Sequence, residues 1–311
     1  MKHLKLLSAL LFVFLISCNP NSKRAANLVN QKNSLVNTTR IQDSKSQSNP
    51  KANIKNSNAL TIASWNIRDL GKTKNDQEIL QIAKIIRDYD IVALQEVVAK
   101  DPGGAKAVAK IADELNRMGS KWDYRISDPT KSPSVYISER YAFLWKTSKV
   151  KLTSRAFLDS ELEDKCFREP YIGKFQLKNG DEPFYVINFH SRKFNDNPEQ
   201  EIIFFKDYPK RLKSDRVLIV GDFNLNENHE VWDHLYYIGF KSALKNTKTT
   251  LKTKCKKKNY LNYSIDNIYF PSSNIEMLKS GSNDFVNDCY NLQSARLLSD
   301  HLPVYMEFLV N

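Results

Sequence analysis

The stretch from Arg216 to Asn224 constrains the fold more than any other part of this 311-residue chain. Val217–Val220 are apolar, and Gly-Asp-Phe-Asn follows at 221–224. A short apolar run closed in this way is typical of a β-strand that is buried on both faces. Asp222 and Asn224 would then stand at the end of a rigid strand, where polar side chains can meet solvent and a ligand. An Asx turn that only closes a strand is the commoner explanation of such a pattern, so the rest of the chain has to decide.

Five other apolar runs also carry polar residues at one end. They cover residues 60–65, 91–94, 184–189, 267–270 and 302–308. Polar residues follow the first three runs and precede the last two. If the last two strands run antiparallel to the others, all six polar ends lie on one rim of a mixed sheet. That rim would collect Asn66, Glu96, His190, Asp222, Asn224, Asp266, Asp300 and His301.

Four segments between the apolar runs have the apolar spacing of helices. They cover residues 77–89, 105–118, 198–212 and 230–238. Apolar strands that alternate with amphipathic helices predict sheets whose outer faces are covered by helices. Because we find no internal repeat and no second linker, we expect one α/β domain over residues 59–311.

The N-terminal residues predict export and anchoring. Residues 1–18 contain a short apolar run from Leu6 to Ile16, and Leu-Ile-Ser-Cys at 15–18 resembles a bacterial lipobox. We therefore expect Cys18 to be lipidated and to hold the chain on a membrane of the bacterial cell envelope, facing the periplasm or the exterior. An ordinary signal peptide with an incidental Cys is the alternative. Residues 19–58 are rich in Asn, Ser, Lys and Gln without an apolar period, which predicts a disordered tether.

Much of the net charge of +12 belongs to this N-terminal part. Residues 1–58 hold nine Lys or Arg and one acidic residue, which leaves 38 basic and 34 acidic residues in 59–311. That remaining excess is a mild preference for polyanions. Its strongest local form is residues 252–258, which contain five lysines. We expect a solvated loop there, or alternatively a loop that contacts nucleic acid.

The cysteines say little about function. Apart from Cys18, the chain has Cys166, Cys255 and Cys289, which allow at most one disulfide and leave one thiol. No spacing of Cys and His indicates a zinc site.

The expected rim supplies the groups that phosphoryl transfer to water requires. Carboxylate and amide oxygens without a thiolate suit Mg²⁺, Mn²⁺ or Ca²⁺ better than Zn²⁺. A histidine held by a carboxylate can act as general base on water, and a second histidine can protonate or stabilise the departing oxygen. A divalent cation neutralises the charge that builds on the phosphate. Each residue alone has an ordinary structural explanation, but six coincidences at strand ends favour a site.

Eight motifs occur in the order found in the endonuclease/exonuclease/phosphatase superfamily, which the chain resembles from about Leu60 to Phe308. Gly-Asp-Phe-Asn at 221–224 together with Ser-Asp-His-Leu-Pro-Val at 299–304 is a specific pair. Glu-Arg-Tyr at 139–141 and Arg-Glu-Pro at 168–170 are similar to the deoxyribonuclease I branch. The other four are Ser-Trp-Asn-Ile-Arg at 64–68, Leu-Gln-Glu-Val at 94–97, Asn-Phe-His-Ser at 188–191 and Ser-Ile-Asp-Asn at 264–267.

The resemblance implies a four-layer α/β sandwich, in which two mixed β-sheets pack face to face between outer helices. It implies a metal-dependent enzyme, using Mg²⁺ or else Mn²⁺ or Ca²⁺, that hydrolyses phosphodiester bonds in nucleic acid. We expect an extracytoplasmic, monomeric DNA endonuclease whose contact with the membrane is made through the lipid anchor alone.

The resemblance also implies roles for individual residues. The metal ligands by position are Glu96, the main one, with Asn66, Asp300 and Asp222 beside it. The catalytic groups would be His190 paired with Glu139, His301 paired with Asp266, and Asp222 and Asn224, which hold the phosphate, water or a second metal. Arg168, Arg140 and Asn224 would contact the substrate. For Arg168 alone, a surface salt bridge is an equally good explanation.

Two positions depart from the deoxyribonuclease pattern. Val98 stands where that branch has an Arg, two residues after the metal-binding Glu, and Ile137 stands where it has a Tyr. Both positions contact duplex DNA in that branch, so single-stranded DNA and RNA remain open as substrates. An enzyme of the same fold for phospholipid, as in a sphingomyelinase, or for inositol phosphate is the alternative. A surface lipoprotein that binds nucleic acid without catalysis is the second alternative.

Overall fold

The computed structural model describes residues 58–132 and 137–311. The signal peptide, the lipobox residue Cys18 and residues 19–57 of the tether lie outside the described residues. Within the described ranges, no helix is both long enough and apolar enough to cross a bilayer.

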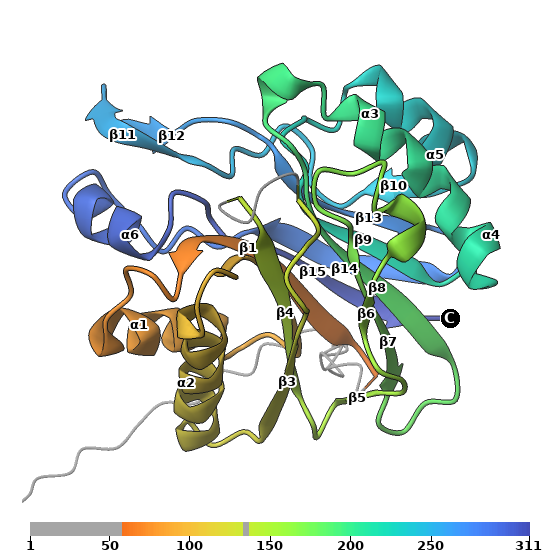
Figure 1. The fold of residues 1–311 in the computed structure, drawn as a ribbon, viewed down its shortest axis with the longest axis horizontal. Coiled ribbons are helices and arrows are strands. Elements are labelled where there is room, and N and C mark those ends of the chain that lie inside the picture. Colours follow the sequence, from red (N-terminus) through yellow and green to blue (C-terminus); the bar gives the residue numbers. More distant parts are fainter. Residues whose placement is uncertain (1–57, 133–136) are drawn as a thin grey trace, which may run out of the picture. The chain divides into compact units, whose positions relative to one another are not determined.

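The first sheet contains six strands in the order β14-β15-β1-β2-β4-β3 (Figure 1). β1 runs parallel to β2 and antiparallel to β15, and β2 runs antiparallel to β4. The strands are β1 (Leu60–Leu70), β2 (Ile91–Val98), β3 (Trp122–Ile126), β4 (Glu139–Lys146), β14 (Ile275–Ser282) and β15 (Val304–Val310).

The second sheet has seven strands. Six form the order β10-β13-β9-β8-β7-β5, and β6 also pairs with β7. β8 and β9 are parallel, whereas β13 is antiparallel to β9. The strands are β5 (Val150–Leu152), β6 (Phe157–Leu158), β7 (Tyr171–Leu177), β8 (Pro183–His190), β9 (Val217–Asp222), β10 (Phe240–Ser242) and β13 (Asp266–Pro271).

The reversed direction expected for the last two apolar runs is confirmed, because β15 and β13 are antiparallel to their neighbours β1 and β9. The runs are divided between two sheets, however, rather than collected in one. β9 is buried along its whole length, as the sequence around Gly221 predicts.

Helices cover the outer face of each sheet (Figure 1). α1 (Asp76–Ile86) and α2 (Gly103–Arg117) pack on the first sheet, and α3 (Glu199–Ile202), α4 (Tyr208–Leu212) and α5 (Asp233–Tyr237) lie on the second. A third apolar cluster, which includes Phe143, Val186 and Val220, fills the space between the sheets. These layers confirm the expected four-layer α/β sandwich.

Strand alternation places the polar rim residues between the sheets. Side chains alternate faces along a strand, and Leu218 and Val220 of β9 belong to the cluster between the sheets. Asp222 therefore continues the same inward-facing row at the end of the strand. Phe184 and Val186 place His190 inward in β8 by the same alternation. The site thus lies at one end of the inter-sheet core.

Two local expectations were wrong. The predicted helix over 198–212 is broken into α3, a 3₁₀ segment Ile203–Asp207 and α4. Pro209, in the first turn of α4, supplies the reason, because proline lacks an N–H and its ring clashes with the preceding turn of a continuous helix.

The lysine-rich segment is a β-hairpin and not a loop. β11 (Leu251–Lys256) and β12 (Asn259–Leu261) pair antiparallel, and Lys257 and Lys258 form the turn with positive φ. Cys255 forms a disulfide with Cys289, which precedes α6 (Leu292–Leu298), and Cys166 is a buried free thiol.

Candidate active site

Three neighbouring strands of the second sheet present a row of polar side chains. His190 of β8 and Asp266 of β13 are the register partners of Asp222 on its two sides. Gly221 permits this close arrangement, because a Cβ there would lie 1.8 Å from the backbone oxygen of Phe189. The glycine of the Gly-Asp-Phe-Asn motif is therefore required by the approach of β8 to β9.

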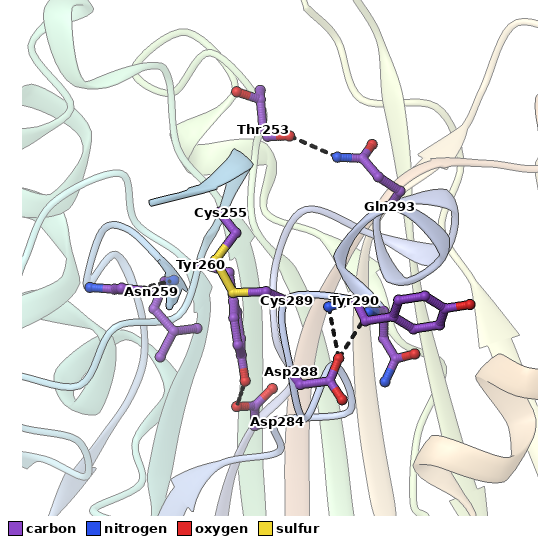
Figure 2. Close-up of a disulfide and its surroundings, with 11 residues drawn as sticks. Thr253, Cys255, Asn259, Tyr260, Asp284, Asp288, Cys289, Tyr290 and Gln293 are labelled. Atoms are coloured by element: carbon purple, nitrogen blue, oxygen red, sulfur yellow. Dashed lines mark hydrogen bonds between the residues drawn. A yellow bond between two sulfur atoms is a disulfide. The ribbon is translucent and has the colours of Figure 1, made fainter. Parts of the chain in front are cut away.

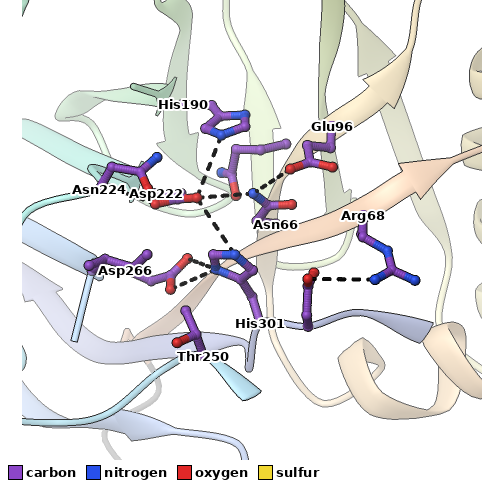
Figure 3. A network of polar contacts seen from close by, with 12 residues as sticks. Asn66, Arg68, Glu96, His190, Asp222, Asn224, Thr250, Asp266 and His301 are labelled. Atoms are coloured by element: carbon purple, nitrogen blue, oxygen red, sulfur yellow. Dashed lines mark hydrogen bonds and ion pairs between the residues drawn. The ribbon is translucent and has the colours of Figure 1, made fainter. Parts of the chain in front are cut away.

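Asp222 lies at the centre of the site (Figure 3). Its Oδ2 is 3.6 Å from Nε2 of His190 and 3.8 Å from Nε2 of His301. Asn66, from β1 of the other sheet, donates from Nδ2 to the same oxygen at 3.1 Å. Both sheets and both histidines thus meet at one carboxylate.

The first histidine–carboxylate pair joins the two sheets. Nδ1 of His190 is 2.9 Å from Oε2 of Glu139, which lies at the start of β4. Nε of Arg168 is 2.7 Å from the other oxygen of Glu139. Burial would raise the pKa of Glu139, but the charges of His190 and Arg168 outweigh it and lower that pKa below its usual value. Glu139 is therefore held as a carboxylate.

The second pair consists of His301 and Asp266. Nδ1 of His301 is 2.9 Å from Oδ2 of Asp266, and the hydroxyl of Thr249 donates to that oxygen at 2.6 Å. Burial would lower the pKa of His301, but the carboxylates of Asp266 and Asp222 raise it to about 10. Burial and the charge of Asp222 raise the pKa of Asp266, against the opposing effect of His301.

The two pairs orient their imidazoles in the same way. In each ring Nδ1 lies against a carboxylate, and this places the Nδ1 proton in that hydrogen bond. Nε2 of each ring then faces Asp222 and is the atom that can exchange a proton with a ligand. Two such nitrogens on either side of one acidic group can serve an attacking and a departing oxygen.

Glu96 and Asn66 fit a divalent cation. Glu96 sits in an irregularity of β2 with a φ of 58°, which turns its carboxylate out of the strand alternation. Its Oε1 accepts from Nδ2 of Asn66 at 3.0 Å, and its Oε2 accepts from the backbone N–H of Asp69 at 3.3 Å. Oδ1 of Asn66 is buried without a hydrogen-bond partner in the described part of the chain. A carboxylate beside an unpaired amide oxygen is a donor set that a hard cation accepts.

Asp222, Asp266 and His301 also bring ligand atoms within 4.8 Å of one another. Nδ1 of His301 and the carboxylate of Asp266 are already hydrogen-bonded to each other, however. A cation bound through Nδ1 of His301 would have to replace that bond, whereas one bound through Nε2 would leave it in place. The Glu96–Asn66 side of the site offers a buried amide oxygen without a partner in the described part of the chain and is therefore the better place for a metal.

The remaining predicted site residues are Asp300, Asn224, Arg168 and Arg140. Asp300 forms ion pairs with Arg68 at 3.6 Å and Arg296 at 3.7 Å, and within the described residues it is not hydrogen-bonded to Glu96 or Asn66. The backbone N–H of Asn224 donates to Oδ1 of Asp222 and closes an Asx turn, with a φ of 52° at Asn224. The strand-ending turn and the candidate site are therefore both present at these residues.

The two arginines differ in their positions. Besides its contact with Glu139, Arg168 donates from Nη1 to the backbone oxygen of Ser191 at 3.1 Å, so it braces the first pair. Arg140 follows Glu139 on β4, and strand alternation turns it to the opposite face. Its Nη1 donates to the backbone oxygen of Ser127 at 2.7 Å. The structure therefore does not bring Arg140 to the two histidines.

Several contributing residues were missed from the sequence. Thr249 and Tyr141 support the two pairs, since the hydroxyl of Tyr141 accepts from the backbone N–H of His190 at 3.2 Å. Gln95 and Asn188 form a buried hydrogen bond of 2.6 Å between the sheets, directly beneath the site. Gln95 adjoins Glu96 in its motif, and Asn188 lies two residues before His190 in its own, so these motifs were the available signal. Thr249 lies outside every motif.

A cavity of about 730 Å³ extends from Glu96 and Glu139 and is also lined by the divergent positions Val98 and Ile137. Lys72, Arg168 and Lys193 line it as well. Asp69 and Asp101 line it too, so acidic and basic side chains share the wall of this cavity beside the first histidine–carboxylate pair. At Val98 and Ile137 the wall of the cavity is apolar, as the departure of these two positions from the deoxyribonuclease pattern predicts.

Comparison with known proteins identifies a family match and relatives that cover different shares of this chain. The Endonuclease/Exonuclease/phosphatase family matches residues 63–301. A "Deoxyribonuclease" of Thioalkalivibrio sp. (strain K90mix) is 26% identical over 268 residues, covering 80% of this chain and 71% of that protein. "Deoxyribonuclease-1" of Bos taurus is 32% identical over 176 residues, so the matched part spans 53% of this chain and 61% of the bovine protein.

Solved structures share the fold at lower identity. An endonuclease/exonuclease/phosphatase family protein from Bacteroides thetaiotaomicron has a TM-score of 0.58 and 18% identity, over 81% of this chain and 98% of its own. The mannosyl-6-phosphatase Bt3783 of the same species gives the same TM-score and identity, over 80% of this chain and 99% of its own.

These matches confirm three expectations from the sequence, namely the fold, the enzyme class and a dependence on metal. The family match covers most of the described domain and includes both histidine–carboxylate pairs. The chain therefore belongs to the Endonuclease/Exonuclease/phosphatase family.

Proposed function

We propose that this protein is a deoxyribonuclease that hydrolyses phosphodiester bonds of DNA with Mg²⁺, for which Mn²⁺ or Ca²⁺ are the alternatives. One observation carries the proposal: Nε2 of His190 and Nε2 of His301 approach the same carboxylate, Asp222, from two sides. The names of the bacterial and bovine relatives, both deoxyribonucleases, support DNA as the substrate.

The chain's own residues supply proton transfer and orientation. One imidazole accepts a proton at Nε2 from the attacking water, and the other gives a proton from Nε2 to the departing oxygen. Glu139 and Asp266 fix the rings through Nδ1 and stabilise the positive charge that an imidazole gains on protonation. Asp222 lies within reach of both rings, where it can orient the water.

Glu96 and Asn66, with Asp222, are the residues that would hold the cation. When bound, a divalent cation there would offset negative charge on the phosphate. Asp300 enters this set only if it leaves Arg68 and Arg296. Within the proposal, Arg168 acts mainly by bracing Glu139, and its role as a phosphate contact is secondary.

We further propose that the enzyme works outside the cytoplasm as a monomer on a lipid anchor at Cys18. The lipobox-like sequence at 15–18 supports this location. The disulfide between Cys255 and Cys289 also supports it, because disulfides form and persist in oxidising compartments.

The test is a substrate panel for the purified full-length protein. Duplex DNA, single-stranded DNA, RNA and sphingomyelin are incubated with Mg²⁺, Mn²⁺ or Ca²⁺, and each reaction is repeated with EDTA. We expect metal-dependent cleavage of DNA that EDTA abolishes. A folded protein that hydrolyses sphingomyelin but no nucleic acid would overturn the proposal.

A further inference from the structure

The β11–β12 hairpin carries the densest run of lysines in the sequence of the described domain. Five lysines occupy seven consecutive positions, and Lys254, Lys256, Lys257 and Lys258 are exposed. In residues 58–132 and 137–311, none of the five forms an ion pair with a carboxylate. Like charges held this closely repel one another, so the hairpin needs anchoring from elsewhere in the fold.

The base of the hairpin is bonded to the segment that carries His301. Thr250 forms an isolated β-bridge with His301. The backbone N–H of Leu251 donates to the oxygen of Asp300 at 2.7 Å, and that of Leu302 donates to the oxygen of Thr249 at 2.7 Å. Thr249 is also the residue that donates to Asp266. The hairpin therefore begins at the second histidine–carboxylate pair.

Toward its turn, the hairpin is bonded to the segment around α6 (Figure 2). The disulfide joins Cys255 of β11 to Cys289. Gln293 donates from Nε2 to the backbone oxygen of Thr253 at 2.9 Å, and the hydroxyl of Tyr260 donates to Asp284 at 2.5 Å. A small apolar cluster with Leu251, Leu292 and Leu302 lies beneath these contacts. The lysines are thus held on a fixed support and not on a free loop.

We propose that the β11–β12 hairpin binds the phosphate backbone of the substrate beyond the scissile bond, and that the Cys255–Cys289 disulfide holds it in position to do so. This inference rests on the proposed function, because it assumes a nucleic acid substrate. The hairpin lysines act on binding, and the histidine–carboxylate pairs act on the chemical step.

A nucleic acid fits this hairpin better than a lipid surface does. The hairpin continues directly from the segment of His301, so a strand with its scissile phosphate at the site has neighbouring phosphates within reach of such an extension. A membrane-binding hairpin would be expected to add exposed apolar side chains to its basic ones. The exposed positions of this turn are Lys256, Lys257, Lys258 and Asn259.

The first test replaces Lys254, Lys257 and Lys258 by Gln in the full-length protein. Each lost phosphate contact removes about 0.9 from the slope of log K against log salt, so we expect a slope smaller by about 2–3 and a KM for duplex DNA raised at least about tenfold. The kcat and the hydrolysis of bis(p-nitrophenyl) phosphate, a diester too small to reach the hairpin, should stay unchanged.

The matched control replaces Lys121, Lys149 and Lys178 by Gln. These three are also exposed, and backbone hydrogen bonds place them together at the far end of the sheets from the site. Both triple variants lose the same charge. Equal changes in KM for the two variants would show general electrostatic attraction and would overturn a specific role for the hairpin.

The second test addresses the disulfide. Reduction of the wild-type protein, or the double substitution Cys255→Ser and Cys289→Ser, should raise the KM for DNA several-fold while hydrolysis of the small diester persists. Reductant should have no further effect on the double variant, which shows that it acts through this bond. Reduced wild-type protein with an unchanged KM for DNA would overturn the positioning role.

Two outcomes separate this inference from the proposed function. If neither DNA nor the small diester is hydrolysed, the proposed function fails and this inference fails with it. If DNA is cleaved but the hairpin substitutions lower only the binding to phosphatidylcholine vesicles that contain phosphatidylglycerol, the proposed function stands and the hairpin serves a membrane. That second result would overturn this inference alone.

Discussion

The two histidine–carboxylate pairs face one acidic group but are built differently. The first pair joins β8 of the second sheet to β4 of the first, and Arg168 binds its carboxylate. The second pair is formed by β13 and the segment before β15, and a hydroxyl, that of Thr249, binds its carboxylate. The two imidazoles are therefore oriented alike, although a cation binds the carboxylate of the first pair and a neutral donor binds that of the second.

The difference appears in the charge balance of the two carboxyl groups. The pKa of Glu139 is lowered, because its cationic neighbours outweigh burial. The pKa of Asp266 is raised, because burial and the nearby Asp222 outweigh His301. In the first pair, cationic neighbours thus neutralise the carboxylate of Glu139. In the second pair, the carboxyl groups of Asp266 and Asp222 lie close together, so an added positive charge there would stabilise them.

The largest effect is expected from removing either imidazole. His190→Ala and His301→Ala should each lower kcat by about 10²–10⁴-fold, the usual contribution of general acid–base catalysis. The double variant should be little worse than the single variants, because both rings act in one step. Initial rates of plasmid cleavage measure this loss, and circular dichroism checks the fold.

His234→Ala is the matched control, because His234 is exposed on α5 outside the site. It should retain the wild-type kcat. A folded His190→Ala or His301→Ala protein that keeps more than a tenth of the activity would refute the equal importance of the two pairs.

The two carboxylates should differ in what their removal costs the fold. Glu139→Gln leaves the guanidinium of Arg168 without its charged partner in a poorly solvated site, which costs about 3–5 kcal/mol. Asp266→Asn removes a charged partner of His301 but also relieves repulsion from Asp222, so it should cost less than Glu139→Gln. Urea unfolding in EDTA measures both values without a contribution from bound metal.

A double substitution sharpens this result. Adding Arg168→Met to Glu139→Gln should recover part of the lost stability, because the unpaired charge is then gone. Equal destabilisation by Glu139→Gln and Asp266→Asn would remove the distinction between the two pairs.

The residues of the two pairs differ in whether the sequence alone could predict their place in the site. His190, Asp222 and Asp266 stand at the ends of apolar strands, so strand direction alone placed them on one rim. Glu139 was assigned by resemblance, because the residue lies at the beginning of a strand that was not among the six apolar runs. Thr249 could not be found, since its role depends on the path of the chain between β10 and β11 and not on any local pattern.

The fold, too, could be predicted only in part from local sequence patterns. Apolar runs and their polar ends predicted the strands and their directions, because alternation and burial are local properties of the sequence. The assignment of the strands to two sheets came only from the resemblance, since local patterns do not state which strands pair. The role of Asp300 also depended on distant side chains, because Arg68 and Arg296 take its carboxylate.

The pH dependence of stability should separate the two carboxyl groups further. The folded pKa of Glu139 lies below its usual value of 4.5, so its contribution is present above that pH and is lost as pH falls through the folded pKa. The folded pKa of Asp266 lies above its usual value of 3.8, so its ionisation costs stability as pH rises past that value.

The two variants should therefore change in opposite directions. Between about pH 3 and about pH 6, the unfolding free energy of wild type minus that of Glu139→Gln should increase with pH. The unfolding free energy of wild type minus that of Asp266→Asn should decrease over the same range. Urea unfolding in EDTA across this range gives both curves. Parallel curves would contradict the charge balance described for the two pairs.

The smallest effect is expected at Thr249, which supports only the second pair. Thr249→Val removes the donor to Asp266 but keeps the shape of the side chain, so the loss of about 0.5–1.5 kcal/mol should appear as a two- to about tenfold lower kcat. Thr249→Ser should restore activity, because it keeps the hydroxyl. Thr247→Val is the matched control, since that hydroxyl donates to the backbone oxygen of Lys245. If Thr249→Val and Thr247→Val show the same kcat, the neutral donor has no part in the second pair, and Asp266 must be held by His301 alone.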